Sequence, residues 1–169
     1  MMSTRDLVLT ALFAAIIVAL GLLPPISLGF IPVPITAQSL GVMMAGVVLG
    51  GRRGAIAVLI VLVLVAIGLP VLSGGRGGLA IFASPTAGFL IGWIFAAFVT
   101  GYLSERLVNH QQSGLVQTVS FFLTAMVGGI VVLYAFGIAY LATVAGLGFT
   151  KAFVGSMAFI PGDVIKAFV

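Results

Sequence analysis

The chain has 169 residues, of which 62% are hydrophobic and only 6% charged, and its formal net charge is +4. A soluble domain carries about 25% charged residues, so seven basic and three acidic side chains cannot cover a water-facing surface. Together with a mean hydropathy of +1.39, this composition predicts an all-α integral membrane protein in a lipid bilayer. The scattered lysines and arginines form no basic stripe, which argues against nucleic acid as a partner.

We expect one transmembrane domain, residues 1–169, built as a six-helix bundle. A bilayer core takes about 20 apolar residues per helix, with a range of roughly 17–25. The predicted helices cover residues 5–23, 36–50, 53–69, 85–107, 115–145 and 161–169. The last one would rise only about 14 Å at ~1.5 Å per residue, which is half a membrane, so we expect it to be truncated in this sequence.

Helix 1 is expected to end at Pro24-Pro25, because proline cannot continue the helical hydrogen-bond ladder. It carries Ala11, Ala15 and Ala19 at a spacing of four residues. Such a row of small residues lets another membrane helix approach closely, either a partner's or one of the same bundle. Four prolines in residues 24–35 predict an extended or re-entrant loop, and Thr36 is a candidate N-cap for helix 2.

Further along, Arg52-Arg53 is predicted to form the turn into helix 3, and a glycine-rich segment at 72–84 precedes helix 4, with Pro85 at its first position. Residues 104–114 are expected to form a polar loop in which His110 is a solvated residue. The fifth helix is long enough to need tilt or a kink near Gly128-Gly129 or Gly137. Residues 146–160 are expected to be a loop with room for a short interfacial helix.

The distribution of basic residues predicts the orientation. With a cytoplasmic N-terminus, the four arginines Arg5, Arg52, Arg53 and Arg106 lie inside, and Arg76 and Lys151 lie outside. This orientation places the proline-rich loop, the glycine-rich segment and the start of the last helix on the external side.

Enzyme motifs are missing from the sequence. There is no G-x-x-x-x-G-K-[ST], no H-E-x-x-H and no G-x-S-x-G. Asp6, Glu105 and Asp163 are far apart in sequence, and the predicted topology separates Asp163 from the other two. We therefore expect no catalytic site, no metal site and no cofactor.

The strongest candidate site is "PGDVIK" (161–166), which places Asp163 and Lys166 on one helix face. A charge at membrane depth costs at least about 2.5–3.5 kcal/mol, so an intramembrane ion pair suggests a function. The alternative is structural: Asp163 would favour the helix N-terminus, and Lys166 would extend to the interface.

Two other segments offer ligand-binding groups. In "GGRGG" (74–78), Gly75 and Gly77 leave backbone N–H groups accessible and Arg76 can pair with a carboxylate, although a flexible outer turn explains the segment equally well. Thr36 and Gln38 lie at the mouth of helix 2, where Gln38 can both donate and accept.

Three segments together resemble one known family. "PVPITAQSLGV" (32–42), "GGRGGLAIFASPTAGFLIG" (74–92) and "PGDVIK" (161–166) look like signature segments of the BioY family, the biotin-binding S components of energy-coupling factor (ECF) transporters. The resemblance covers nearly the whole chain.

The resemblance implies a six-helix S component in the bacterial cell (inner) membrane that captures biotin from outside. A transmembrane T component would dock on the alanine face of helix 1, and two cytoplasmic ATPases would supply the energy. Biotin's ring would lie among apolar side chains such as Phe82. Asp163 would accept from the ureido N–H, and Lys166 would hold the ureido oxygen or the acid tail. The outer face, with Arg76, Lys151 and Lys166 against Asp163, suits an anionic vitamin.

Two alternatives stay open at this point. One is an S component for another vitamin, such as thiamine or riboflavin. The other is a non-transporting membrane scaffold, which would need no Asp163–Lys166 pair.

Overall fold

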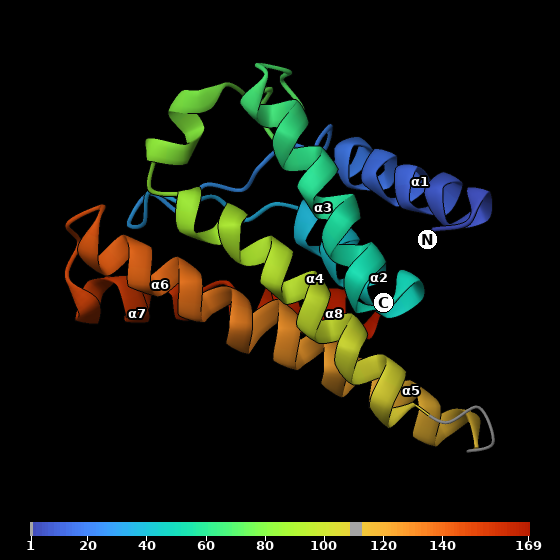
Figure 1. Cartoon of the computed structure of the whole chain (residues 1–169). Helices are drawn as coiled ribbons and strands as arrows, with labels where there is room; N and C mark the ends of the chain where they lie inside the picture. The colour runs from blue at the N-terminus through green and yellow to red at the C-terminus, as the bar shows by residue number, and fades with distance from the viewer. Residues whose placement is uncertain (1, 109–112) are drawn as a thin grey trace.

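The computed structural model describes residues 2–108 and 113–169, so His110 lies outside the described residues (Figure 1). The α-helices are α1 Thr4–Leu20, α2 Gln38–Leu49, α3 Gly51–Ala66, α4 Ala87–Leu107, α5 Gly114–Met126, α6 Leu133–Thr143, α7 Phe149–Met157 and α8 Ile160–Phe168. A 3₁₀ turn, η1, covers Leu79–Ala83, and a π-helical segment, η2, covers Val127–Val132. The predicted all-helical class is confirmed.

Within the described residues, two continuous helices are long and apolar enough to cross a membrane, Ala87–Leu107 and Gly114–Thr143. The second consists of α5, η2 and α6 joined end to end, and its π-helical segment includes Gly128-Gly129, one of the two places where the sequence predicted a kink if the helix did not tilt. Gly128 in this segment allows a close approach to α4. A Cβ on Gly128 would lie 1.9 Å from the Thr100 hydroxyl and 2.6 Å from the Ala96 carbonyl oxygen.

Several predicted helix ends differ from the structure. Helix α1 ends at Leu20, three residues before its predicted end at 23, and α3 ends at Ala66 rather than 69. Arg52 and Arg53 belong to the first turn of α3, because Gly50 alone reverses the chain with a φ of 82° that only glycine adopts easily.

Two predicted helix starts are also wrong. Helix α2 is capped by Ala37 without a side-chain bond, so Thr36 is not its N-cap. Pro85 precedes α4, whose N-cap is Thr86.

Helix α4 is the centre of the bundle, in contact with α2, α3, α5, α6 and η2. Glycines allow its close approach to α2 and α3 at one end. A Cβ on Gly46 would lie 2.6 Å from the Ala97 carbonyl oxygen, and one on Gly101 would lie 2.3 Å from the Gly51 nitrogen. This end of the bundle is packed backbone to backbone, which leaves the opposite half for side chains and a cavity.

Charged residues gather at the glycine-packed end. Asp6 of α1 forms an ion pair with Arg53 of α3, and Arg106 of α4 stacks on Tyr102 at 4.9 Å from the ring centre. Arg52, Arg53 and Arg106 line one groove at this end of the bundle. The fold thus brings to one end three arginines that the sequence assigned to one side of the membrane.

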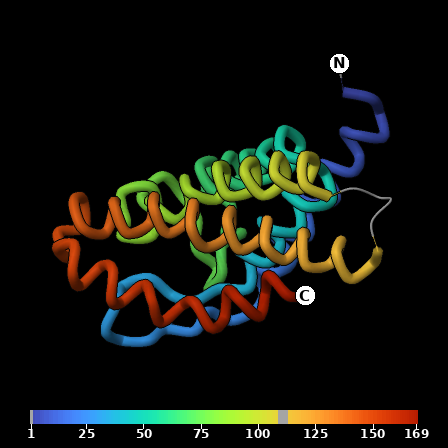
Figure 2. The backbone as a smooth tube through the Cα atoms, turned by 90° about the horizontal axis from the view of Figure 1, so that it is seen from below, coloured from blue at the N-terminus to red at the C-terminus, as the bar shows by residue number. Residues whose placement is uncertain are grey.

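The proline-rich loop lies along the last two helices. Residues 21–37 contain no helix, only a two-residue bridge between Ile26 and Ile35, and in Figure 2 they run beside α7 and α8. Ile31 contacts the backbone of α7, where a Cβ on Gly155 would lie 2.9 Å from its side chain. The predicted loop at 146–160 holds α7, an additional short helix.

Candidate functional site

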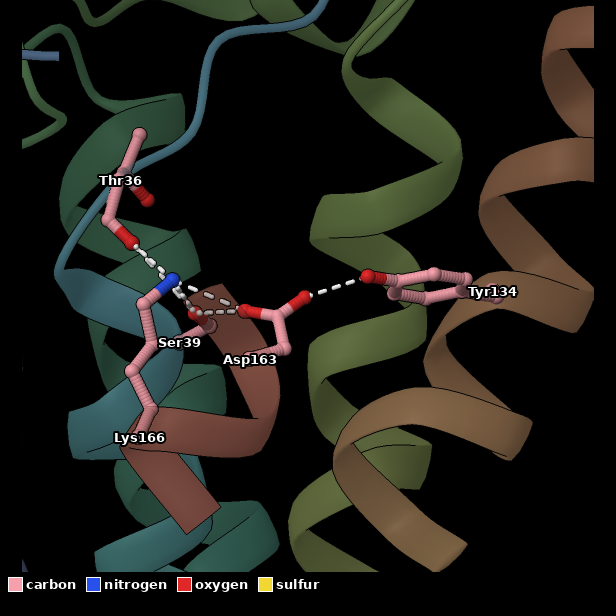
Figure 3. Close-up of polar contacts among 5 residues, drawn as sticks. All are labelled: Thr36, Ser39, Tyr134, Asp163 and Lys166. Atoms are coloured by element: carbon pink, nitrogen blue, oxygen red, sulfur yellow. Dashed lines mark hydrogen bonds and ion pairs between the residues drawn. The ribbon is translucent and has the colours of Figure 1, made fainter. Parts of the chain in front are cut away.

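Asp163 and Lys166 form an ion pair inside the bundle. The Lys166 Nζ lies 2.8 Å from the Asp163 Oδ1, and their side chains are only 15% and 7% exposed (Figure 3). The i, i+3 spacing on α8 brings the two together, as the sequence predicted. The pair faces α2 and α6 rather than lipid, since Ser39 and Tyr134 both contact it.

Three further groups complete this polar cluster. The Tyr134 hydroxyl donates to the Asp163 Oδ2 at 2.6 Å, and the Ser39 hydroxyl lies 3.4 Å from Oδ1. The Lys166 Nζ also donates to the Thr36 carbonyl at 2.8 Å and to the Ser39 Oγ at 2.9 Å. An ammonium has three N–H donors, so all three donors of Lys166 are used within the protein.

A cavity opens beside the pair, and we call it the Asp163 cavity. It encloses about 560 Å³ of non-atom space including the open solvent at its mouth, and about 60 Å³ of it can hold the centres of water molecules. Its side-chain walls include four aromatic residues, Phe89, Trp93, Tyr134 and Phe159. The rings of Phe89, Tyr134 and Phe159 make mutual edge-to-face contacts at 6.0 to 6.4 Å between centres. The site therefore combines apolar walls with one charged, hydrogen-bonded corner.

Arg76 is the second cation on the cavity wall. Its Nε donates to the Ser73 carbonyl at 3.2 Å, and its terminal amino groups make no hydrogen bond to any residue of the described ranges. Partial burial lowers the pKa of the guanidinium, which stays cationic because arginine titrates above about 12. Arg76 thus has donors available for an anionic group.

The other predicted site residues lie in different surroundings. Thr36 and Gln38 line the cavity, where Thr36 uses its carbonyl to accept from Lys166. Gly75, Gly77 and Phe82 are not part of the cavity wall. The carbonyl of Phe82 accepts from the Tyr140 hydroxyl at 3.3 Å, which ties η1 to α6. The structure does not bring these three to the ion pair.

The alanine row of α1 points away from the bundle. Ala11, Ala15 and Ala19 are all exposed, whereas Phe13 and Ile17 on the opposite face are buried. A smooth helix face of small residues is therefore accessible along α1.

Sequence reasoning missed Tyr134, Ser39 and the aromatic walls. Phe89 and Trp93 stand at i and i+4 on α4, a spacing that places them on one face, but the same pattern is typical of core packing. Tyr134 is the one hydroxyl in the apolar stretch "GGIVVLYAFG" (128–137), and that contrast was the available signal.

Comparison with known proteins identifies the family. The sequence pattern of the BioY family matches residues 1–169. The chain belongs to the BioY family. It is 95% identical to "Biotin transporter BioY" of Rhizobium etli, over 99% of the chain and 90% of that protein. It is 55% identical to the BioY biotin transporter of Rhodobacter capsulatus, over 98% of the chain and 88% of that protein.

The fold agrees with that of a solved structure. A crystal structure described as the S-component for biotin from an ECF-type ABC transporter matches with a TM-score of 0.91 and 35% identity. The match covers 99% of this chain and 89% of that one. The BioY resemblance seen in the sequence is therefore confirmed, together with the S-component fold.

Proposed function

We infer that this chain is the biotin-binding S component of an ECF-type transporter. The family, the relatives named as biotin transporters and the matching S-component structure support this function. The observation that carries it is the buried Asp163–Lys166 pair at the edge of an aromatic cavity. A transporter component needs no catalytic residues, and the family is one of transporters rather than enzymes.

Biotin's polar groups fit the unused hydrogen-bonding capacity of the site. The ureido ring has two N–H donors, and the carboxylate of Asp163, with about four acceptor positions, has three donors around it. Asp163 can therefore accept a further bond from a ureido N–H. The fused ring is mostly apolar and suits the walls formed by Phe89, Trp93 and Phe159.

The two cations have different roles in this proposal. All three N–H donors of Lys166 already bond to protein oxygens. Lys166 can therefore bond to a ligand only if one of these bonds is broken. The Arg76 amino groups bond to none of the described residues, so they can form a forked contact with the ligand's carboxylate. We propose that Arg76 holds the acid tail, while Lys166 chiefly orients Asp163 through their ion pair.

The charge of the cavity favours biotin over a cationic vitamin. Its walls carry Arg76 and Lys166 against Asp163, which gives +2 − 1 = +1. A mono-anion neutralises this charge, whereas a cation such as thiamine would add to it. Lys151 lies outside this cavity, so it does not contribute to the contact charge.

We also propose the transporter partners and the orientation. A transmembrane T component would dock on the exposed face formed by Ala11, Ala15 and Ala19, and two cytoplasmic ATPases would complete the assembly. The protein would span the bacterial cell (inner) membrane with its N-terminus in the cytoplasm, so that the Asp163 cavity faces outward. The gathering of Arg52, Arg53 and Arg106 at one end supports this orientation.

Titration calorimetry on the purified protein tests the function. We expect tight, one-to-one binding of biotin and no measurable binding of thiamine or riboflavin at the same concentrations. The methyl ester of biotin is the matched ligand control: it keeps the ring and removes the negative charge, so it should bind more weakly. Absence of biotin binding, or preference for another vitamin, would contradict the proposal.

A further inference from the structure

Gln38 occupies an unusual position between three separate parts of the chain. Its side chain is 1% exposed at the start of α2. The Nε2 donates to the Ile17 carbonyl of α1 and to the Val71 carbonyl of the following loop, both at 3.1 Å. The Oε1 accepts from the Ser73 backbone N–H at 3.0 Å and from the Ser73 hydroxyl at 3.3 Å.

These four bonds use the whole capacity of the amide. A glutamine side chain has two N–H donors and one oxygen with two acceptor positions, and each is occupied by protein. The partners also fix its orientation, because a flipped amide would place its oxygen against two carbonyl oxygens. Gln38 therefore has no polar atom to offer a ligand, although its side chain borders the Asp163 cavity.

The segment that Gln38 holds carries part of the cavity wall. Residues 71–76 belong to no helix and are closed by a backbone bridge between Leu72 and Arg76, with N–O distances of 3.0 and 3.2 Å. Arg76 in turn donates from Nε to the Ser73 carbonyl. The position of the Arg76 guanidinium thus depends on Ser73, and Ser73 is fixed by Gln38.

The end of α1 is built to fit the same junction. A Cβ on Gly21 would lie 2.5 Å from the Val71 carbonyl oxygen and 2.8 Å from the Gln38 Nε2. Gly21 has a φ of −68°, so alanine would meet no backbone strain there, only crowding. The junction therefore requires a small residue on the α1 side and the amide on the α2 side.

We propose that Gln38 is a positioning residue that ties the loop carrying Arg76 to the C-terminal end of α1. This role rests on the proposed function insofar as the loop holds one wall of a biotin site. The Gln38 side chain also connects α1, which carries the exposed alanine row, to the loop at the ligand cavity. A displacement of the α1 end relative to α2 is transmitted to Ser73 and Arg76.

Two substitutions test the junction from opposite sides. Gln38→Met keeps the volume and removes all four bonds, and Gly21→Ala crowds the junction while leaving Gln38 intact. Thr124→Val is the matched control, because Thr124 is also 1% exposed but bonds to Ser104 between α4 and α5, away from the loop. Each variant is purified in detergent as the full chain.

Hydrogen–deuterium exchange gives the first readout. In both test variants, amide exchange should rise roughly tenfold in residues 71–78 and at the end of α1, as expected for loss of one or more hydrogen bonds. Exchange in α4 and α5 should stay as in the wild type. In Thr124→Val, residues 71–78 should keep wild-type exchange, even when its melting temperature falls by as much as that of the two test variants.

The dissociation rate of biotin gives the second readout. It should rise roughly tenfold in Gln38→Met and Gly21→Ala, because the wall with Arg76 is no longer held. Wild-type exchange in residues 71–78 in both test variants would overturn the proposal, as would equal loosening of this loop by the control. If the wild-type chain binds no biotin, the proposed function fails, while the exchange data still decide the role of Gln38.

Discussion

The carboxylate of Asp163 remains in a hydrophobic bundle because its partners come from three different helices. Ser39 belongs to α2, Tyr134 to α6 and Lys166 to α8, and together they surround both oxygens. Removing one member of a buried pair costs about 3–5 kcal/mol, since the other charge is left without a partner. The hydrogen bonds from this pair to Thr36, Ser39 and Tyr134 thus hold α8 against its neighbours, and Asp163 also presents an acceptor to the cavity.

The pair can be tested by two substitutions. Asp163→Asn removes the charge and keeps the shape, so it should lose a charge-assisted bond worth about 1.5–3 kcal/mol, or roughly 10- to 150-fold in biotin affinity. Lys166→Ala should reduce affinity at least as much, because Asp163 then remains buried and unpaired. Titration calorimetry and a melting curve for each variant separate the possibilities. Lower stability with wild-type affinity would mean that the pair is only structural.

At this scale the sequence predicted the charged residues but not their neighbours. Asp163 and Lys166 stand out because they are charged in an apolar chain, and a three-residue spacing fixes their common face. Trp93 does not stand out, because aromatic residues on a helix face are usual in any core, and the lone hydroxyl of Tyr134 in an apolar stretch is a weaker signal than a charge. The Gln38 amide bonds to Ile17, Val71 and Ser73. These contacts join distant parts of the chain, so no local sequence pattern could predict them.

At the scale of helices, the π-helical segment η2 packs closely against α4. Gly128 faces the Ala96 carbonyl and the Thr100 hydroxyl, whereas Gly129 faces the flexible end of Met43. The sequence predicted tilt or a kink near this glycine pair or Gly137, and the structure has a π-helical segment at the pair. Arg52-Arg53 was predicted as the turn into helix 3, yet one positive-φ glycine, Gly50, makes the turn.

The two glycines should respond differently to a methyl group. Gly128→Ala should lower the free energy of unfolding by about 1–3 kcal/mol, because a backbone carbonyl cannot move aside. Gly129→Ala should cost less, since the Met43 side chain can rotate away. Melting curves of both variants in the same detergent check this order. An equal or larger loss for Gly129→Ala would mean that α4 is not the rigid neighbour.

The exposed face of α1 makes a separate prediction. Ala15→Leu should leave biotin affinity unchanged, because Ala15 points away from the bundle. It should weaken assembly with a T component by about 1–3 kcal/mol, or roughly 5- to 150-fold, through crowding of a close helix contact. Co-purification with the T component measures assembly, and Ala15→Ser is the small-residue control. Equal loss of biotin binding and assembly would contradict an outward role for this face.

At the scale of the whole molecule, the two ends of the bundle are chemically different. One end is closed by glycine contacts and carries Arg52, Arg53 and Arg106, and the other holds the Asp163 cavity and the irregular segments. The sequence anticipated this polarity from the distribution of arginines, because charge bias needs only the order of the helices. A short helix within residues 146–160 was allowed for, as α7 shows, but the path of residues 21–37 beside it depends on packing and was not foreseen.

This polarity predicts the topology in the membrane. A reporter fused after Glu105 should be cytoplasmic, and one inserted within residues 74–78 should be external. Paired alkaline phosphatase and fluorescent protein fusions, which are active on opposite sides, check each position. The reverse labelling would contradict the orientation and the outward-facing cavity.

The central claim is that biotin occupies an outward-facing cavity beside Asp163, and one labelling measurement tests it most directly. The chain has no cysteine, so Thr36→Cys places a single thiol on the cavity wall without removing the carbonyl that accepts from Lys166. Ser113→Cys is the matched control, an exposed position that the predicted topology assigns to the cytoplasmic side. A membrane-impermeant maleimide applied to spheroplasts should label Cys at 36 but not at 113, and saturating biotin should abolish the labelling. Labelling at position 36 that biotin leaves unchanged, or labelling only at position 113, would contradict the account.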